Sequence, residues 1–344
     1  MELNRFSLPV AAAIMMINAS LLVQGCLEEE RIALLQIKTS IFDPHPNHFG
    51  ASLLLSWGND ALCCGWPGVS CDPITGRVNL LVLYNVRGWF IDPSKAAWSR
   101  DASMGDWYLN ATLFLPFQEL KTLGLRNNYM AGCVAHEGFE RLSRLNKLES
   151  LDLGLNNFNN SILSSLKGLS SLKHLYLDGN QLNGSIDTKD FDSLSKLEEL
   201  DLSENEIENF VTSTGFERPG SLDKLEILDL SSNRISDGNL SFLKGLSSLK
   251  QLHLNKNQFK GSMEMKEFDS LSKLVELRLE ENEIQNFATS AGSERSLGLN
   301  KLEILGLSFN KFNDSSLSFL EGLSSLKQLN LDNNQLKGPM DMKG

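Results

Sequence analysis

The stretch LEILDLSSN at residues 225–233 decides the fold of this chain, because the same phrase recurs along most of its length. The phrase reads Leu-x-x-Leu-x-Leu-x-x-Asn and begins at Leu120, Leu148, Leu172, Leu197, Leu225, Leu249, Leu274, Leu302 and Leu326. It ends at Asn128, Asn156, Asn180, Asn205, Asn233, Asn257, Asn282, Asn310 and Asn334. The spacings of 28, 24 and 25 residues cycle in threes, which gives a longer period of 77 residues. Two nested periods predict a stack of similar coils.

Each phrase predicts a short strand, because the period of two in Leu-x-Leu places both leucines on one face of the strand. A single strand cannot bury that face alone, whereas stacked coils share a continuous core. Phrases of this length and pattern resemble leucine-rich repeats. The resemblance implies an α/β fold, a curved and right-handed solenoid whose parallel strands line the concave face. It also implies that the nine asparagines form a structural ladder, which satisfies buried backbone groups inside the turns.

The cysteines cluster ahead of the repeats. Cys26, Cys63, Cys64 and Cys71 lie there, while Cys133 stands apart. A bond between the adjacent Cys63 and Cys64 needs unusual geometry, which leaves Cys26–Cys63 with Cys64–Cys71, or Cys26–Cys64 with Cys63–Cys71. The residues themselves do not choose between these pairings. No paired Cys-x-x-Cys or partner histidine completes a zinc site, and Cys133 is interpreted as a partly buried free cysteine.

The sequence around these cysteines resembles the plant-type leucine-rich-repeat N-terminal cap. The resemblance is carried by CLEEERIALLQIK at 26–38, LSW at 55–57, CCGWPGVSC at 63–71 and GRV at 76–78. It implies the pairing Cys26–Cys63 with Cys64–Cys71, and a cap that covers the apolar edge of the first coil. The pattern predicts a helix over 28–40 with Ile32, Leu35 and Ile37 on its buried side, and a first strand over 77–83.

The chain divides into four predicted parts. Residues 1–25 read as a signal peptide with Arg5 before an apolar run, 26–83 as the cap, 84–119 as an irregular first coil or surface excursion, and 120–344 as about nine repeats. Residues 340–343, MDMK, match MEMK at 263–266, so the last phrase is expected to continue and the array to be truncated at its C-terminus. A span of about 20 apolar residues is absent after the signal peptide.

Composition and motifs argue against several function classes. The formal charge of −11 and the lack of a Lys/Arg cluster disfavour nucleic-acid binding. The histidines His45, His48, His136, His174 and His253 are scattered, and Gly-x-Ser-x-Gly, His-Glu-x-x-His and phosphate-loop motifs are missing. We therefore predict no enzyme, no catalytic or metal-binding residue and no cofactor.

The recognition site is expected on the residues that flank the strand leucines, because these project from the concave sheet. One column reads Gly124, Asp152, Tyr176, Asp201, Asp229, His253, Arg278, Gly306, Asn330, and the second reads Arg126, Gly154, Asp178, Ser203, Ser231, Asn255, Glu280, Ser308, Asp332. Copies 77 residues apart keep the frame but change these columns. The candidate ligand-binding residues are Tyr176, Asp178, Asp201, Asp229, His253, Arg278, Glu280, Asn330 and Asp332. Drift at exposed positions is the competing explanation.

Glycosylation is expected in the Asn-x-Ser/Thr sequons that follow the signal peptide. They are Asn110, Asn159, Asn183, Asn239 and Asn313. Four of them follow a ladder asparagine by three or six residues. That spacing puts glycans after the strands and leaves the concave columns free.

Taken together, cap and repeats resemble the amino-terminal part of a plant receptor-like protein, a cell-surface receptor that lacks a kinase domain. The resemblance implies a non-enzymatic module in the secretory pathway that binds a peptide or protein ligand and a co-receptor kinase in defence or development. If a membrane anchor follows this chain in the full-length protein, the resemblance implies a place at the extracellular face of the plasma membrane. Without an anchor the protein would be secreted. Two alternatives stay open: a secreted inhibitor or decoy resembling polygalacturonase-inhibiting proteins, and an ectodomain fragment of a leucine-rich-repeat receptor kinase.

Overall fold

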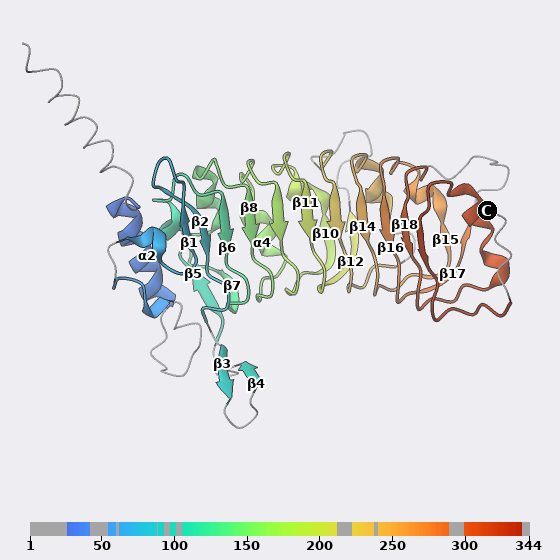
Figure 1. The fold of residues 1–344 in the computed structure, drawn as a ribbon, viewed down its shortest axis with the longest axis horizontal. Coiled ribbons are helices and arrows are strands. Elements are labelled where there is room, and N and C mark those ends of the chain that lie inside the picture. Colours follow the sequence, from blue (N-terminus) through green and yellow to red (C-terminus); the bar gives the residue numbers. More distant parts are fainter. Residues whose placement is uncertain are drawn as a thin grey trace, which may run out of the picture.

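The computed structural model describes residues 26–41, 54–59, 62–87, 89–92, 97–100, 105–211, 222–236, 240–288 and 299–338. The expected signal peptide and the sequon at Asn239 lie outside these residues. The described chain winds into an elongated solenoid, with the cap helix α2 at one end and the last coils at the other (Figure 1). The predicted leucine-rich-repeat solenoid is confirmed.

One sheet of 11 strands runs along the described solenoid. Its strands in spatial order are β1 (Val69–Cys71), β2 (Val78–Val82), β6 (Thr122–Gly124), β8 (Ser150–Asp152), β9 (His174–Tyr176), β11 (Glu199–Asp201), β13 (Ile227–Asp229), β14 (Gln251–His253), β16 (Glu276–Arg278), β18 (Ile304–Gly306) and β19 (Gln328–Asn330). Only β1 pairs antiparallel; the rest are parallel and in register, so that Leu200 lies between Leu175 and Leu228. Equivalent residues of successive coils therefore become neighbours.

The leucines of the phrase form one continuous core. Every strand leucine from Leu123 to Leu305 is nearly inaccessible to solvent. Phenylalanines such as Phe191 and Phe268 fill the far side of the coils. The return segments carry α4 (Ser161–Ser165) and the 3-10 helices η1 (Cys63–Gly65), η2 (Ala111–Phe114), η3 (Phe139–Arg144), η4 (Thr188–Phe191), η5 (Ser241–Gly245), η6 (Met265–Phe268), η7 (Asp314–Ser316) and η8 (Ser318–Gly322).

Shorter sheets lie outside the main one. Three are parallel pairs, formed by β5 (Trp107–Leu109) with β7 (Met130–Cys133), β10 (Asn183–Asp187) with β12 (Glu206–Val211), and β15 (Lys260–Glu264) with β17 (Glu283–Ala288). The fourth is an antiparallel hairpin of β3 (Trp89–Asp92) and β4 (Ala97–Arg100), which projects from the solenoid in Figure 1. The hairpin belongs to the segment 84–119 that the sequence marks as irregular.

Each of the nine phrase asparagines is bonded inside its turn. Asn205 shows the pattern: its Nδ2 donates to the carbonyls of Leu177, Leu202 and Ser203 at 3.0–3.1 Å, and its Oδ1 accepts from Leu182 N at 3.0 Å. The amide thus ties two coils together. The residue before each asparagine has a left-handed backbone, yet only Gly179 is a glycine there. The others in that series are Asn127, Leu155, Glu204, Ser232, Lys256, Glu281, Phe309 and Asn333.

The cap covers the first coil. Its disulfides are Cys26–Cys63 and Cys64–Cys71, the pairing that the family resemblance implies. Helix α2 (Glu28–Ile41) buries Glu30, Ala33, Leu34, Ile37 and Ile41. The prediction for Ile32 was wrong, because it is 46% exposed. The buried set follows the 3.6-residue period from position 30, which places Ile32 on the opposite side of the helix.

Candidate functional site

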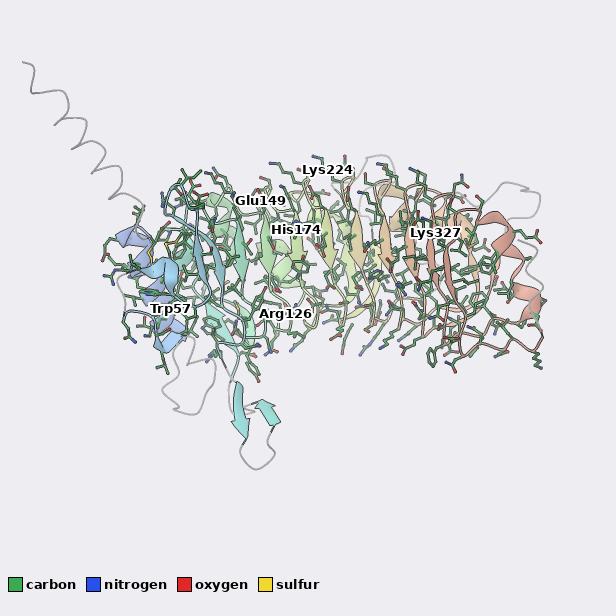
Figure 2. The ribbon with its side chains drawn as sticks, viewed as in Figure 1. Trp57, Arg126, Glu149, His174, Lys224 and Lys327 are labelled. Carbon is green, nitrogen blue, oxygen red and sulfur yellow. A yellow bond between two sulfur atoms is a disulfide. The ribbon has the colours of Figure 1, made fainter. Side chains whose placement is uncertain are left out.

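The candidate residues of the first column stand side by side on the main sheet, and those of the second column lie two residues past the ends of the strands. In-register pairing places Asp201 between Tyr176 and Asp229, and His253 between Asp229 and Arg278. Figure 2 shows the side chains standing on these strands, with His174 and Arg126 labelled. The same strand geometry places a third column of side chains on this face, two residues before the first column on each strand. His174, Glu199 and Glu276 belong to this third column. The third column was missed by the sequence prediction, although the period of two could have found it.

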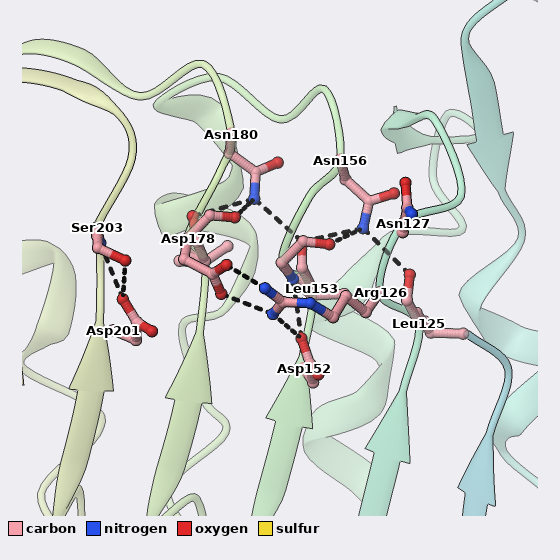
Figure 3. A network of polar contacts seen from close by, with 12 residues as sticks. Leu125, Arg126, Asn127, Asp152, Leu153, Asn156, Asp178, Asn180, Asp201 and Ser203 are labelled. Carbon is pink, nitrogen blue, oxygen red and sulfur yellow. Dashed lines mark hydrogen bonds and ion pairs between the residues drawn. The ribbon is translucent and has the colours of Figure 1, made fainter. Parts of the chain in front are cut away.

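A cluster on β6 to β9 is already occupied by its own ion pairs. Arg126 donates to Asp178 through both terminal nitrogens and lies 3.4 Å from Asp152 (Figure 3). A Cβ at Gly154 would clash with the Arg126 guanidinium, so glycine makes room for this contact. Arg126 keeps its charge, because the Asp178 hydrogen bond raises its pKa. Asp178 is thereby engaged within the protein.

Asp201, at the end of β11, is a half-buried carboxylate of the first predicted column. It accepts from Ser203 N at 2.9 Å and from Ser203 Oγ at 2.7 Å (Figure 3). Burial raises its pKa to about 6, and the negative charges of Asp178 and Asp229 add to this effect. A cation on this part of the face would be attracted to it.

The third column supplies a glutamate to the neighbouring aromatic pair. Glu199 Oε2 accepts from Tyr176 Oη at 2.9 Å and lies 3.1 Å from His174 Nδ1. Burial raises the pKa of Tyr176, and the hydrogen bond to Glu199 acts in the same direction. Tyr176 is therefore a neutral, oriented side chain on the concave face.

A second ionic cluster covers β13 to β16. His253 Nδ1 lies 3.0 Å from Asp229, and His253 Nε2 lies 3.7 Å from Glu276. Arg278 contacts Glu276 at 2.6 Å and Glu280 at 3.2 Å, both through Oε1 of the glutamate. A Cβ at Gly306 would overlap the Glu280 carboxylate, so this glycine leaves space for it. Glu276 belongs to the third column that the sequence prediction missed.

These side chains surround a hollow of about 740 Å³ on the concave face. Its lining residues are Asp229, Ser231, His253, Asn255, Lys256, Glu276, Arg278, Glu280, Glu281, Ser308, Phe309, Asn330, Asp332 and Asn333. The structure thus brings together six of the nine predicted site residues. Tyr176, Asp178 and Asp201 lie on the coils before it. A hollow of this size accommodates a side chain or a short peptide segment.

The His253 pair should give a pH-dependent stability. The hydrogen bond to Asp229 raises the pKa of His253, with Glu276 aiding and burial and Arg278 opposing. Burial would raise the pKa of Asp229, but the hydrogen bonds from His253 and Ser231 lower it overall. The stabilisation from His253 is fully present below the ordinary histidine pKa and is lost as pH rises through the raised pKa of the folded state. The aspartate contribution is lost only when pH falls through its lowered pKa.

We therefore expect the stability difference between the wild type and His253→Asn to shrink as pH rises from about 6 to about 9. Urea unfolding at a series of pH values measures it. The variant Asp229→Asn should remove the same pH-dependent part, because it deletes the acceptor. A difference that stays constant over this range would contradict the assignment.

The remaining predicted positions lie away from the hollow. Asn159, Asn183 and Asn313 are exposed, and Asn110 is half-buried with its Oδ1 accepting from Thr112 N at 2.9 Å.

Cys133 is a half-buried free thiol on β7, and burial raises the pKa of this thiol to about 12. A thiol with a raised pKa is a poor nucleophile.

Comparison with known protein families identifies the two parts of the molecule. The leucine rich repeat N-terminal domain matches residues 27–72, and leucine rich repeat models match 144–167, 171–194, 193–209 and 223–284.

Among the described residues, no helix combines the length and apolarity needed to cross a membrane.

The chain is similar to plant receptors in sequence. It is 38% identical to Receptor-like protein 9a of Arabidopsis thaliana over 195 residues, which is 54% of this chain and 18% of that protein. It is 34% identical to Cuscuta receptor 1 of Solanum lycopersicum over 303 residues, or 83% of this chain and 25% of that protein. The chain thus spans a quarter or less of the length of these two relatives.

A solved structure gives the same picture. The Arabidopsis receptor kinase HAESA, in complex with the peptide hormone IDA and the co-receptor SERK1, superposes with a TM-score of 0.61. It is 25% identical, and the match covers 90% of this chain and 46% of HAESA. Both the leucine-rich-repeat family and the ectodomain fold are non-enzymatic. The plant-type cap, the repeat solenoid and the relatives together support a plant leucine-rich-repeat receptor-like protein, to whose amino-terminal part this chain is similar.

Proposed function

We propose that this chain is an extracellular recognition module whose concave face binds a peptide or protein ligand. The observation that supports this most directly is the variation of the face on a constant frame. Tyr176, His253 and Asn330 occupy one phase of the 77-residue cycle, and Asp201 and Arg278 another. In the structure these changing residues lie on one continuous sheet, where a single extended ligand would contact several of them.

The chemistry of the face suits recognition rather than turnover. Ion pairs fix Arg126 and Arg278 in place, and a hydrogen bond to Asp229 fixes His253, so little side-chain freedom would be lost on binding. Peptide complexes of related plant ectodomains, such as HAESA with IDA, support a peptide as the class of ligand. A co-receptor kinase, a role in defence or development, and a place at the plasma membrane or in the apoplast complete the proposal. The exposed Asn159, Asn183 and Asn313 would carry glycans.

Selection from a displayed library of random twelve-residue peptides tests the proposal. We expect the wild-type chain to enrich related peptides, and the variant with Tyr176, Asp201, His253 and Arg278 all changed to alanine to bind them at least about 100-fold more weakly. Loss of several central contacts has effects of this order. Isothermal titration of the selected peptides gives the affinities.

The matched control changes four charged residues outside the main sheet, Glu206, Lys260, Glu264 and Glu283, to alanine. This variant should bind as the wild type does. Equal binding by the wild type and the concave variant would overturn the assignment of the concave face.

A further inference from the structure

We infer that the hollow over β13 to β19 is a subsite for a cationic group, the guanidinium or ammonium of an arginine or lysine side chain. The inference rests on the proposed function, since it names the chemistry of one subsite for a peptide ligand. Three independent features of the hollow support it: its charge, its unpaired buried acceptors, and an exposed aromatic ring at its edge.

The lining carries an excess of negative charge. Its five carboxylates are those of Asp229, Glu276, Glu280, Glu281 and Asp332, against the cations Lys256 and Arg278 and the histidine His253. Lys256 pairs with Glu281 at 3.5 Å. Arg278 is shared between two glutamates, and His253 lies between two carboxylates. Lys256, Arg278 and Nδ1 of His253 are thus already engaged, while negative charge is left over to attract a positive ligand.

Besides His253 Nε2, two buried acceptors in the hollow have no hydrogen-bond partner among the described residues. One is Glu280 Oε2, whose fellow oxygen Oε1 accepts from Arg278. The other is Oγ of Ser308, a residue that is only 3% exposed. Buried polar atoms without partners are uncommon, because each loses its bonds to water. A guanidinium or an ammonium brings several donors and no acceptor, which is what an unpaired carboxylate oxygen requires.

Phe309 supplies an apolar surface beside these acceptors. It lines the hollow and is 55% exposed. Its φ of 57° is a left-handed conformation that disfavours bulky residues, and the equivalent position one cycle earlier is Ser232. An aromatic face next to excess negative charge is a suitable environment for a cation, and also packs against the methylene stem of lysine or arginine.

Peptides selected on the wild-type chain test the subsite. We expect them to be enriched in arginine or lysine. Replacing the arginine of such a peptide by citrulline, which has the same shape without the charge, should weaken binding by about tenfold or more. Glu280→Gln should weaken the arginine peptide by a similar factor and leave the citrulline peptide unchanged, since the two changes remove the same contact. Glu264→Gln, on β15, is the matched control.

Failure of this inference is distinguishable from failure of the proposed function. Selected peptides without basic residues, or equal binding of the citrulline peptide, would overturn the cationic subsite but leave concave-face recognition standing. Equal weakening of both peptides by Glu280→Gln would also overturn it. A direct probe needs no selected peptide: N-acetyl-arginine methylamide should shift the His253 ring resonances more than its citrulline counterpart does. Equal shifts would count against the subsite.

Discussion

Replacing Arg77 by alanine is expected to lower the free energy of unfolding at pH 7 by about 3 to 5 kcal/mol, as for other buried ion pairs that lose one partner. Glu30 is fully buried in the cap, and its carboxylate lies 3.1 Å from Arg77 Nε. The same carboxylate accepts from Leu27 N and Val78 N at 3.2 Å. Without Arg77, a charged group would remain in the interior with only backbone donors.

The effect of this substitution should depend on pH. Burial raises the pKa of Glu30, although the hydrogen bonds from Val78 and Arg77 oppose the rise. A carboxylate with a raised folded-state pKa costs stability when ionised, and that cost falls as pH drops and the group takes up a proton. The destabilisation by Arg77→Ala should therefore be smaller at pH 5 than at pH 7. Urea unfolding at both values measures it.

The neighbouring pair in the same helix provides the control. Arg31 contacts Glu28 at 2.6 Å, but Glu28 is largely exposed. Because exposed pairs contribute little, Arg31→Ala should leave the unfolding free energy nearly unchanged. If Arg77→Ala behaves like Arg31→Ala, the buried contact is not what joins the cap to the first coil.

Replacing Asn205 by alanine is expected to lower the free energy of unfolding by about 3 to 4 kcal/mol, since several buried groups lose their partners at once. The amide satisfies three carbonyls and one backbone N–H from two successive coils. Each coil of a repeat array is stabilised only by its neighbours, so the loss of Asn205 should act locally. Faster hydrogen exchange should therefore centre on the coils that contain β9 and β11. Denaturant unfolding and hydrogen exchange together measure these effects.

Asn255→Ala is the matched control for Asn205→Ala. Asn255 has the same side chain and lies two residues before another ladder asparagine, but on the concave face, where it lines the hollow. Its replacement should change stability by no more than about 0.5 kcal/mol, as is usual at such surface positions. Similar losses from both substitutions, or uniform exchange along the chain, would show that the ladder is not the source of the effect.

The repeat phrase predicted the fold because its physics is local. Leu228 and Leu230 must point the same way from any strand that contains them, and stacking then buries them. The same reasoning correctly placed the first candidate column on one sheet, while the second column lies just past the strand ends. It placed Ile32 on the wrong side of the cap helix, because the buried face includes the charged Glu30, which the apolar residues alone do not reveal.

Contacts between coils could not be predicted from the phrase. Arg126 and Asp178 are 52 residues apart, and their bond passes over the strand that carries Asp152. Which side chain bends over which neighbour depends on where glycine leaves space, as Gly154 and Gly306 do here. These are properties of three coils together, so no single repeat contains the information.

The paired outer strands indicate how such a molecule changes length. β10 with β12 and β15 with β17 occupy equivalent places 77 residues apart, and the two pairs form separate sheets. A gain or loss of one whole cycle would leave each pair intact, whereas one coil inserted between the two strands of a pair would separate them. Duplication in blocks of three coils is therefore neutral for these pairs wherever it occurs, and each block adds three new positions per column on which selection can act.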